Sequence, residues 1–321
     1  MKKSIISKLL FASIALGILM CTAALASCSN QSRQLTQLNV SYVTAPFNLP
    51  TIIMKNKGIL EDSLAQENIE VHWHEIVSGA QQAEAMAAGS LDIGGVMNTS
   101  SIFMARAAGN DVRIISGFSQ PTQMFCIVSS DSTIQSIADL RGHSIAGPKG
   151  TVLHQLLLAA LASENMTIDD VEFIHMGLAP ASAAMAAGQI DAALLAGSMV
   201  MQAQNEGARI ITSAQGLVVP KLVIAARGSF AEQHPDLVVA YREAHQQAQQ
   251  WMEQNLEQAL QIGADEQGIS LEQARQLYDW TQFGSEISPA DLESMQQDID
   301  FMLSNDMLQQ AIDPESSLLR L

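Results

Sequence analysis

The sequence predicts an α/β protein built from two similar lobes that are joined by two chain crossings. Three observations lead to this expectation: a helix-and-strand unit that occurs twice, two extended segments that each contain a proline, and a helical C-terminal region. Roughly 290 residues would remain after an N-terminal export signal, which is enough for two lobes of ordinary domain size.

The repeated unit is centred on the pentapeptide Ala-Met-Ala-Ala-Gly, which occupies residues 85–89 and, 99 residues later, residues 184–188. Asp92 and Asp191 follow the two copies at the same spacing. Alanine and methionine favour helix, and each glycine suits the left-handed position at which a helix ends. A short apolar strand follows each copy. This alternation of helices and strands predicts a parallel sheet with crossover helices in each lobe.

A chance match between two alanine-rich helices is the alternative explanation of the repeat. It does not account for the shared Gly-x-x-Asp spacing. It also leaves unexplained why residues 113–115 and 209–211 both read Arg-Ile-Ile, and why a strand-like segment at 39–43 is echoed at 143–146. We therefore interpret the two copies as two related structural units.

Two extended segments lie where the lobes should join, at residues 117–128 with Pro121 and at residues 217–226 with Pro220. If the chain crosses between the lobes at both places, the first lobe is discontinuous. The resulting division places residues 38–120 and 221–321 in the first lobe and residues 121–220 in the second. The C-terminal part is rich in Gln and Glu and should form helices that pack on the first lobe.

The N-terminus has the features of an export signal. Lys2, Lys3 and Lys8 precede a short apolar run, and the chain then reads Leu-Ala-Ser-Cys up to Cys28. This order is typical of a secretory signal peptide, and the last four residues resemble a bacterial lipobox. The expected product is cleaved after residue 27, acylated at Cys28, exported, and connected to its fold by a polar tether at residues 28–37. The alternative is an ordinary signal peptide in which Cys28 is incidental.

The charge and the cysteines exclude several classes of function. The net charge is −17, and removal of the signal would take away three lysines and no acidic residue. Nucleic acids and anionic membrane surfaces require clustered Lys and Arg, so we expect no nucleic-acid binding and membrane attachment through the lipid alone. The three cysteines are Cys21, Cys28 and Cys126. Only Cys126 would remain free in the fold, where its apolar neighbours predict a buried thiol, and no disulfide or cysteine cluster is possible.

Several short motifs resemble one known family. In chain order they are Gly-Ile-Leu-Glu from Gly58, Ser78-Gly79, Ala-Ala-Gly-Ser-Leu-Asp-Ile-Gly from Ala87, Ala-Ala-Gly-Asn-Asp-Val from Ala107, Ile-Ala-Asp-Leu-Arg-Gly from Ile137, Lys149-Gly150-Thr151, Gly-Gln-Ile-Asp-Ala from Gly188, and His234-Pro235. The ordered set resembles the binding-protein family of nitrate, sulfonate and taurine importers, which also includes binders of thiamine-pyrimidine precursors. The resemblance covers nearly the whole mature chain.

The resemblance implies a periplasmic-binding-protein-like fold of type II, with a cleft between the lobes that closes on a small solute. It implies a monomeric partner of the membrane subunits of an ABC importer, without enzymatic activity and without a cofactor. Members of the family often carry an aromatic residue and a proline after the Asp-Ala pair, where this chain reads Leu-Leu-Ala-Gly-Ser-Met from Leu194. The solute therefore stays open between a sulfonate-like or nitrate-like anion and a pyrimidine precursor. The same fold could also serve a solute sensor or an enzyme of the pyrimidine-synthesis type, two functions that the sequence favours less.

The solute is expected at the carboxyl ends of the strands, because ligands of open α/β sheets bind there. The loops at these ends lead into helix N-termini, whose free N–H groups and positive dipole ends attract small anions. Six such loops occur, and ordinary helix capping is the alternative role of each. The candidate contacts in the first lobe are Thr44, Pro46, Phe47, Asn48, Ser78, Gly79, Asn98, Thr99 and Ser100. Those in the second lobe are Lys149, Gly150, Thr151, Pro180, Ser198 and Met199.

Other chemistries find weaker support. His72 and His74 share one face of a predicted strand and, with Glu75, could form a zinc site. A half-exposed strand with a buried Trp73 explains the pattern more simply. We therefore expect no metal. The loop at Lys149 lacks the spacing of a nucleotide-binding P-loop, and no Gly-x-Ser-x-Gly elbow occurs. Among the other histidines, His154 is a cleft candidate or a buried residue, His175 is expected to pack within its strand, and His234 and His245 are expected on exposed helix faces.

Overall fold

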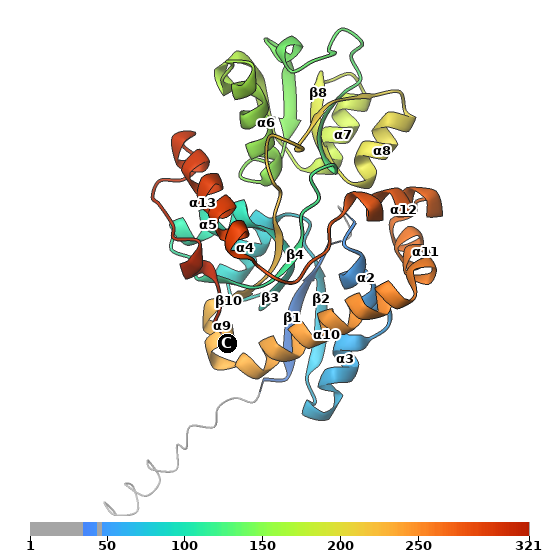
Figure 1. Cartoon of the computed structure of the whole chain (residues 1–321), viewed down its shortest axis with the longest axis vertical. Coiled ribbons are helices and arrows are strands. Elements are labelled where there is room, and N and C mark those ends of the chain that lie inside the picture. The colour runs from blue at the N-terminus through green and yellow to red at the C-terminus, as the bar shows by residue number, and fades with distance from the viewer. Residues whose placement is uncertain (1–34, 44–46, 321) are drawn as a thin grey trace, which may run out of the picture. The chain divides into compact units, whose positions relative to one another are not determined.

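The structure is a computed structural model that describes residues 35–43 and 47–320. The predicted signal peptide, Cys28, most of the predicted tether, Thr44 and Pro46 lie outside the described residues. Residues 37–321 form one compact unit. This unit contains two five-stranded sheets, each flanked by helices (Figure 1).

The first sheet has the strand order β2-β1-β3-β10-β4. Its strands are β1 (Gln37–Tyr42), β2 (Glu70–Glu75), β3 (Ile93–Asn98), β4 (Val112–Ser119) and β10 (Leu222–Arg227). The helices connecting them are α2 (Leu49–Asn56), α3 (Ile59–Leu64), η1 (Ala65–Glu67), α4 (Gly79–Ala87) and α5 (Thr99–Ala107). We call this sheet with its helices the first lobe.

The second sheet has the strand order β7-β6-β8-β5-β9. Its strands are β5 (Phe125–Ser129), β6 (Ser144–Gly147), β7 (Glu172–His175), β8 (Ala192–Ala196) and β9 (Arg209–Ser213). The accompanying helices are η2 (Ala138–Leu140), α6 (Val152–Ser163), η3 (Ile168–Asp170), α7 (Leu178–Ala186) and α8 (Ser198–Asn205). We call this sheet with its helices the second lobe.

The two sheets repeat one topology. β1 occupies the same place in the first sheet as β6 in the second, and β2, β3, β4 and β10 correspond in the same way to β7, β8, β9 and β5. The sequence repeat thus marks equivalent positions in two equivalent sheets. The prediction of an α/β fold with two lobes and two crossings is confirmed.

The prediction of purely parallel sheets is wrong for one strand in each sheet. β10 runs antiparallel to β3 and β4, and β5 runs antiparallel to β8 and β9. Both are the first strand after a crossing. Because the chain leaves each lobe at the carboxyl ends of its parallel strands, it enters the other lobe at the same edge and must run away from it: Phe125 pairs with Ala196, and Leu222 pairs with Asn98.

The repeated aspartates hold the first strand of each lobe in place. An Asp92 carboxylate oxygen accepts the backbone N–H of Asn39 at 3.0 Å, and one of Asp191 accepts that of Ser144 at 2.8 Å. The glycine before each aspartate, Gly89 or Gly188, has a positive φ of 75° or 66°, which ends the preceding helix in the left-handed region as the repeat predicts. The Gly-x-x-Asp spacing is therefore a turn that fastens a helix end to the neighbouring strand.

The C-terminal region is mostly helical and continues from β10. It contains α9 (Gly228–Gln233), α10 (Pro235–Gln254), α11 (Leu256–Gln267), α12 (Leu271–Trp280), α13 (Pro289–Ser304) and η4 (Glu315–Ser317). α10 packs on α2 and α3, α11 on α2, and α13 on α5, all in the first lobe (Figure 1). α12 also contacts α8 of the second lobe, so the tail is not confined to the first lobe.

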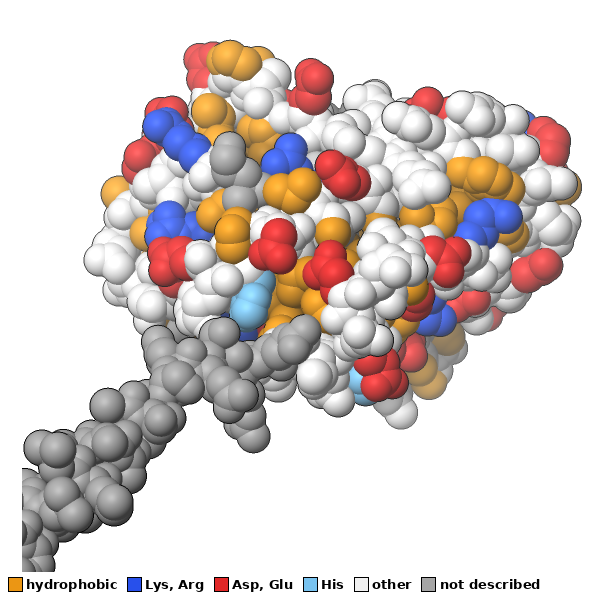
Figure 2. All heavy atoms as spheres, turned by 90° about the horizontal axis from the view of Figure 1, so that it is seen from below, with side chains coloured by type: hydrophobic (Ala, Val, Ile, Leu, Met, Phe, Trp, Pro, Cys, Tyr) orange, Lys and Arg blue, Asp and Glu red, His pale blue; other side chains and the backbone are white. Residues whose placement is uncertain are grey.

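The core of each lobe is apolar, while the surface mixes side chains of all kinds. β5 and β8 are buried along their whole length, as expected for interior strands of a sheet covered on both faces. The face shown in Figure 2 carries scattered acidic side chains, with basic ones singly or in small groups among them. No helix within residues 35–43 and 47–320 is both long enough and apolar enough to cross a membrane.

Candidate functional site

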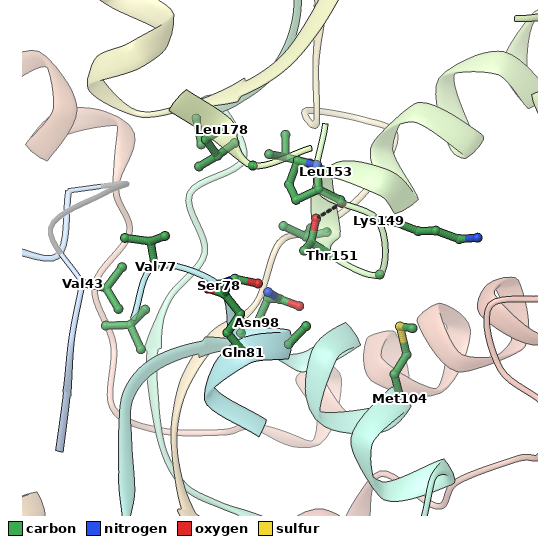
Figure 3. A pocket seen from close by; sticks show the side chains of 18 of the residues that line it. Val43, Val77, Ser78, Gln81, Asn98, Met104, Lys149, Thr151, Leu153 and Leu178 are labelled. Atoms are coloured by element: carbon green, nitrogen blue, oxygen red, sulfur yellow. Dashed lines mark hydrogen bonds between the residues drawn. The ribbon is translucent and has the colours of Figure 1, made fainter. Parts of the chain in front are cut away.

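A pocket of about 580 Å³ lies where the carboxyl ends of both sheets meet (Figure 3). Both lobes line it, since β3 and α4 contribute from the first lobe and β7, α6 and α7 from the second. The lining residues are Val43, Val77, Ser78, Gly79, Ala80, Gln81, Glu84, Val96, Asn98, Met104, Phe125, Pro148, Lys149, Gly150, Thr151, Val152, Leu153, His175, Gly177, Leu178, Ala196 and Leu222. The volume falls in the range of ordinary small-molecule sites.

The first lobe presents two helix N-termini to the pocket. Ser78 is the N-cap of α4 and makes no capping hydrogen bond with its side chain. Asn98 caps α5 by accepting the Ser101 N–H with Oδ1 at 2.8 Å, and its amide lies beside Ser78 in Figure 3. Gly79 allows these two helices to approach, because a Cβ at that position would lie 2.9 Å from the Ser101 hydroxyl oxygen.

The second lobe presents the N-termini of α6 and α7. Gly150, with a φ of 74°, turns the chain into α6 next to Met104 of the first lobe. The Thr151 hydroxyl donates to the Pro148 carbonyl at 2.9 Å, which closes the loop on itself. Gly177 is the N-cap of α7, and Leu178 begins that helix at the pocket wall.

Two histidines hold the loop between β6 and α6. The backbone N–H of Lys149 donates to Nδ1 of His175 at 3.0 Å, and that of Gly150 donates to Nδ1 of His154 at 3.4 Å. His154 is 6% exposed and stacks on Phe173 with ring centroids 5.0 Å apart. Burial, followed by electrostatic interaction with Lys149 and His175, lowers the pKa of His154 to about 4, so its ring is neutral and can accept at neutral pH.

Charged side chains are few among the lining residues. Glu84 on α4 and Lys149 in the second lobe are both exposed, and His175 is the other ionisable side chain in the lining. The Lys149 side chain extends away from Ser78 and Asn98 in Figure 3. Apolar side chains and the first turns of helices form most of the wall.

Six of the predicted contacts lie together at this pocket: Ser78, Gly79, Asn98, Lys149, Gly150 and Thr151. In the first lobe, Phe47 and Asn48 instead belong to the interior, each 1% exposed. Phe47 packs against α11, where a Cβ on Gly263 would come within 2.8 Å of its ring. Asn48 donates from Nδ2 to the Val43 carbonyl at 2.8 Å.

Thr99 and Ser100 are buried on α5, outside the pocket lining. Ser100 forms a bond between the lobes, because its hydroxyl donates to Oε1 of Gln155 on α6 at 2.8 Å. In the second lobe, Pro180, Ser198 and Met199 also fall outside the lining, and Met199 packs on the apolar core of that lobe. The helices there begin earlier than the sequence suggests, so these side chains lie within or behind the first turn.

Three expectations for histidines are corrected by the structure. His175 is exposed and lines the pocket instead of packing within its strand. His245 is buried at 2% exposure against Phe118 because it belongs to the face of α10 that packs on the first lobe, and His234 is half-buried. His154, left open between two positions, is buried beneath the pocket loop.

The side chains of His72 and His74 turn to different neighbours. Nε2 of His74 lies 2.9 Å from the Asn39 side-chain oxygen, and Nε2 of His72 lies 3.4 Å from Glu70. Among the described residues, the side chains close enough to share a metal ion are those of Asp131, His143 and Asp191 in the second lobe. Asp191 already accepts the Ser144 N–H and hydroxyl there, as part of the turn that follows α7.

Cys126 has the properties of a structural thiol, as its apolar surroundings predict. It is fully buried in β5, and burial raises the pKa of its thiol to about 12. A thiolate nucleophile needs the opposite environment, exposed and electropositive.

Residues 61–259 match the family described as NMT1/THI5 like. The chain belongs to this family. A curated relative from Bacillus subtilis (strain 168), named for binding aliphatic sulfonates, is 28% identical over 270 residues, which are 82% of this chain and 80% of the relative. The taurine-binding periplasmic protein of Escherichia coli (strain K12) is 29% identical over 59% of this chain and 60% of its own.

Solved structures show the same fold for this family member. The alkanesulfonate-binding protein SsuA from Xanthomonas axonopodis pv. citri, bound to MOPS, has a TM-score of 0.82 at 23% identity and covers 90% of this chain and 99% of its own. The desulfurization enzyme DSZB has a TM-score of 0.62 at 16% identity over 88% of this chain and 96% of its own. The type II periplasmic-binding-protein-like fold and the family resemblance expected from the motifs are thereby confirmed.

Proposed function

We propose that this protein is the solute-binding component of an ABC importer and that it takes a small organic anion of the sulfonate class. The observation that carries this proposal is the convergence of four helix N-termini, those of α4, α5, α6 and α7, on one pocket lined by both lobes. Relatives named for aliphatic sulfonates and taurine, and one named as an ABC transporter periplasmic binding protein, support it.

The pocket suits a solute that has an anionic head group and an apolar remainder. Backbone N–H groups in the first turn of a helix lack intrahelical partners and point toward the helix entrance, where the dipole favours negative charge. We propose that these N–H groups, with Ser78, Asn98 and Thr151, bind the oxyanion. The apolar side chains of Val77 and Leu178 would then cover a short alkyl chain.

Both lobes contact the solute in this proposal, so the solute favours their approach. The chain passes between the lobes at residues 120–124 and 214–221, and we propose that the lobes rotate about these crossings. The moving bodies would be residues 38–120 with 221–321, and residues 121–220. A solute that touches both shifts the population toward the closed form, which then docks on the membrane subunits of the importer.

A binding role also agrees with the chemistry of the described residues better than an enzymatic one. The fold is shared with a desulfurization enzyme, so fold alone does not decide between the two. Cys126 is buried in the sheet with a raised thiol pKa, which does not suit a nucleophile. Apart from Glu84, Lys149 and His175, the polar groups that line the pocket are helix caps and backbone donors, which can bind charge.

The first experiment is a thermal-shift and calorimetric screen of linear C2 to C8 alkanesulfonates and taurine. Nitrate, a hydroxymethylpyrimidine and the matching alkanols serve as comparisons. We expect stabilisation by one or more sulfonates and none by the alkanols, which lack the charge. X-ray scattering should show a smaller radius of gyration with the bound sulfonate. Stabilisation by the pyrimidine alone would reject the sulfonate class, and an unchanged radius would count against closure.

We also propose export and lipid attachment at Cys28, on the strength of the Leu-Ala-Ser-Cys sequence at residues 25–28. Expression of the full chain in a bacterium should yield a membrane-associated product whose N-terminal peptide carries the mass of a diacylglycerol on Cys28. The Cys28→Ser variant should lose this mass and leave the membrane fraction. An unmodified Cys28 in the wild-type product would leave export by an ordinary signal peptide as the explanation.

A further inference from the structure

His175 stands at the carboxyl end of β7, the edge strand of the second sheet, and its exposed ring lines the pocket. Two residues further along the chain, Gly177 is the N-cap of α7 and also lines the pocket. The ring therefore sits between the N-termini of α6 and α7, where the proposed oxyanion would bind. The hydrogen bond from the Lys149 N–H uses one of its two ring nitrogens.

The hydrogen bond to the loop fixes which ring nitrogen carries the proton. Nδ1 of His175 accepts the Lys149 N–H at 3.0 Å, and an accepting nitrogen is unprotonated. The proton of the neutral ring is then on Nε2, at the edge of the imidazole that is turned away from the Lys149 N–H. The ring thus combines an acceptor for the loop with a donor at its other edge, and it lines the pocket.

The charged groups around His175 favour an anion on the second-lobe side. Lys149 and His154, from the adjoining loop and from α6, face it from its own lobe, and His154 is the neutral acceptor of the Gly150 N–H. Glu84 is the acidic side chain on the first-lobe wall of the same pocket. A negative head group beside His175 would thus lie at the wall of the second lobe, whereas Glu84 belongs to the first.

We propose that His175 is a solute-contacting residue whose Nε2–H donates to the oxyanion head of the bound solute, while its Nδ1 holds the Lys149 loop in position. This inference rests on the proposed function, because it assigns a residue to the same site. It also gives the second lobe a side-chain donor that complements the backbone N–H groups of α6 and α7. His175 would then select solutes whose head can accept a hydrogen bond at this wall.

Two substitutions separate the two roles of the ring. In His175→Asn the amide oxygen can replace Nδ1 as acceptor of the Lys149 N–H, but the donor toward the pocket is lost. In His175→Gln the amide nitrogen can replace Nε2 as donor, but the acceptor for the loop is lost. The probe is the alkanesulfonate that binds the wild type most tightly among the C2 to C8 compounds, measured by calorimetry with the full mature chain.

We expect His175→Asn to bind the sulfonate roughly ten- to a hundredfold more weakly, the usual range for a lost hydrogen bond to a charged group, and to keep the melting temperature of the wild type. His175→Gln should bind within about threefold of the wild type. The matched control is His234→Asn, at the N-cap of α10 and outside the pocket lining, where asparagine is a favoured residue. Equal affinity of His175→Asn and wild type would overturn the inference while leaving the proposed function intact.

A competing explanation is that His175 pairs with Glu84 when the lobes approach and never touches the solute. In that case the effect of His175→Asn would vanish in a Glu84→Gln background, and this result would also overturn the inference.

Imidazole ¹⁵N shifts add a measurement that needs no solute. For the neutral ring, the resonance pair that disappears in His175→Asn should show the tautomer with the proton on Nε2, and the opposite tautomer would contradict the geometry. A wild type that binds no sulfonate would reject the proposed function itself.

Discussion

Asp92 and Asp191 perform the same task in environments that differ in burial. Asp92 is 4% exposed, accepts the N–H and side-chain amide of Asn39, and pairs with Arg227 at 2.5 Å. Asp191 is half-buried and accepts the Ser144 N–H and hydroxyl, both at 2.8 Å. Partial burial opposes ionisation of Asp191, but the hydrogen bonds from Ser144 and from His143 outweigh it and lower the carboxyl pKa.

We expect Asp92→Ala to lower the free energy of unfolding by about 3 kcal/mol, because it removes a buried acceptor and leaves a partly buried N–H and guanidinium without it. Asp191→Ala should cost only about 1–2 kcal/mol, because water can reach the groups it leaves behind. Urea unfolding at pH 7 measures both. Since the two positions are equivalent in the repeat, each variant is the control for the other. Equal losses would mean that burial does not set the strength of this turn.

How well single residues of the site could be predicted depends on whether their exposure is set locally or by the whole fold. Ser78, Asn98 and Thr151 could be placed at the pocket because a capping residue after a strand lies at the carboxyl end of the sheet, although the same reasoning failed for Asn48 and Ser198. His175 and Glu84 could not, because their exposure depends on which face of an edge strand or helix turns to the other lobe. The nearest sequence signal for His175 is its place directly before Met-Gly, at the end of an apolar strand.

At the scale of elements, periodicity and the repeat predicted which segments are strands and helices, but not the direction of β5 and β10. That direction follows from the place where the chain crosses, which is a property of the whole path. The start of a helix can also differ from the position that the sequence predicts. α7 begins at Leu178, so that Pro180 is already inside the first turn, where proline is tolerated because the N–H it lacks would have no partner.

The sequence also did not predict the contacts between elements of the two lobes. Gln155 on α6 accepts the Ser100 hydroxyl from α5 and donates to Asp298 on α13 at 3.1 Å. Lys221, at the end of the second crossing, lies 3.9 Å from the same carboxylate and donates to Ser294 at 2.6 Å. Burial raises the pKa of Asp298 and lowers that of Lys221. The C-terminal helix thus joins both lobes beside the crossing, although its residues are far from either in sequence.

At the scale of the whole molecule, each lobe contains one buried neutral histidine. His245 on α10 belongs to the first lobe and His154 on α6 to the second, and burial lowers the pKa of each from 6.5 to about 4. Both rings take up a proton in the unfolded chain at a pH where they resist it in the folded one. The two lobes are therefore sensitive to acid in the same pH window.

We expect the free energy of unfolding to fall as the pH is lowered from about 6.5 toward 4. The folded pKa of each histidine is depressed, so its contribution is fully present above 6.5 and is lost as the pH approaches 4, up to about 3 kcal/mol for each ring. Aspartates with lowered pKa values, such as Asp191, lose their contribution only at still lower pH, and Asp298, whose pKa is raised, acts in the opposite sense.

His245→Leu tests the first-lobe half of this expectation. Nε2 of His245 is buried without a hydrogen-bond partner, so leucine removes the titrating ring without leaving a polar group unsatisfied. Urea unfolding at pH 7, 6, 5 and 4.5 should show a loss of stability about half as steep as in the wild type, because His154 still titrates in the second lobe. An unchanged slope would mean that His245 opens to water before the lobe unfolds. A slope that disappears altogether would mean that the first lobe alone sets the acid stability and that the second follows it through the contacts of Gln155 and Asp298.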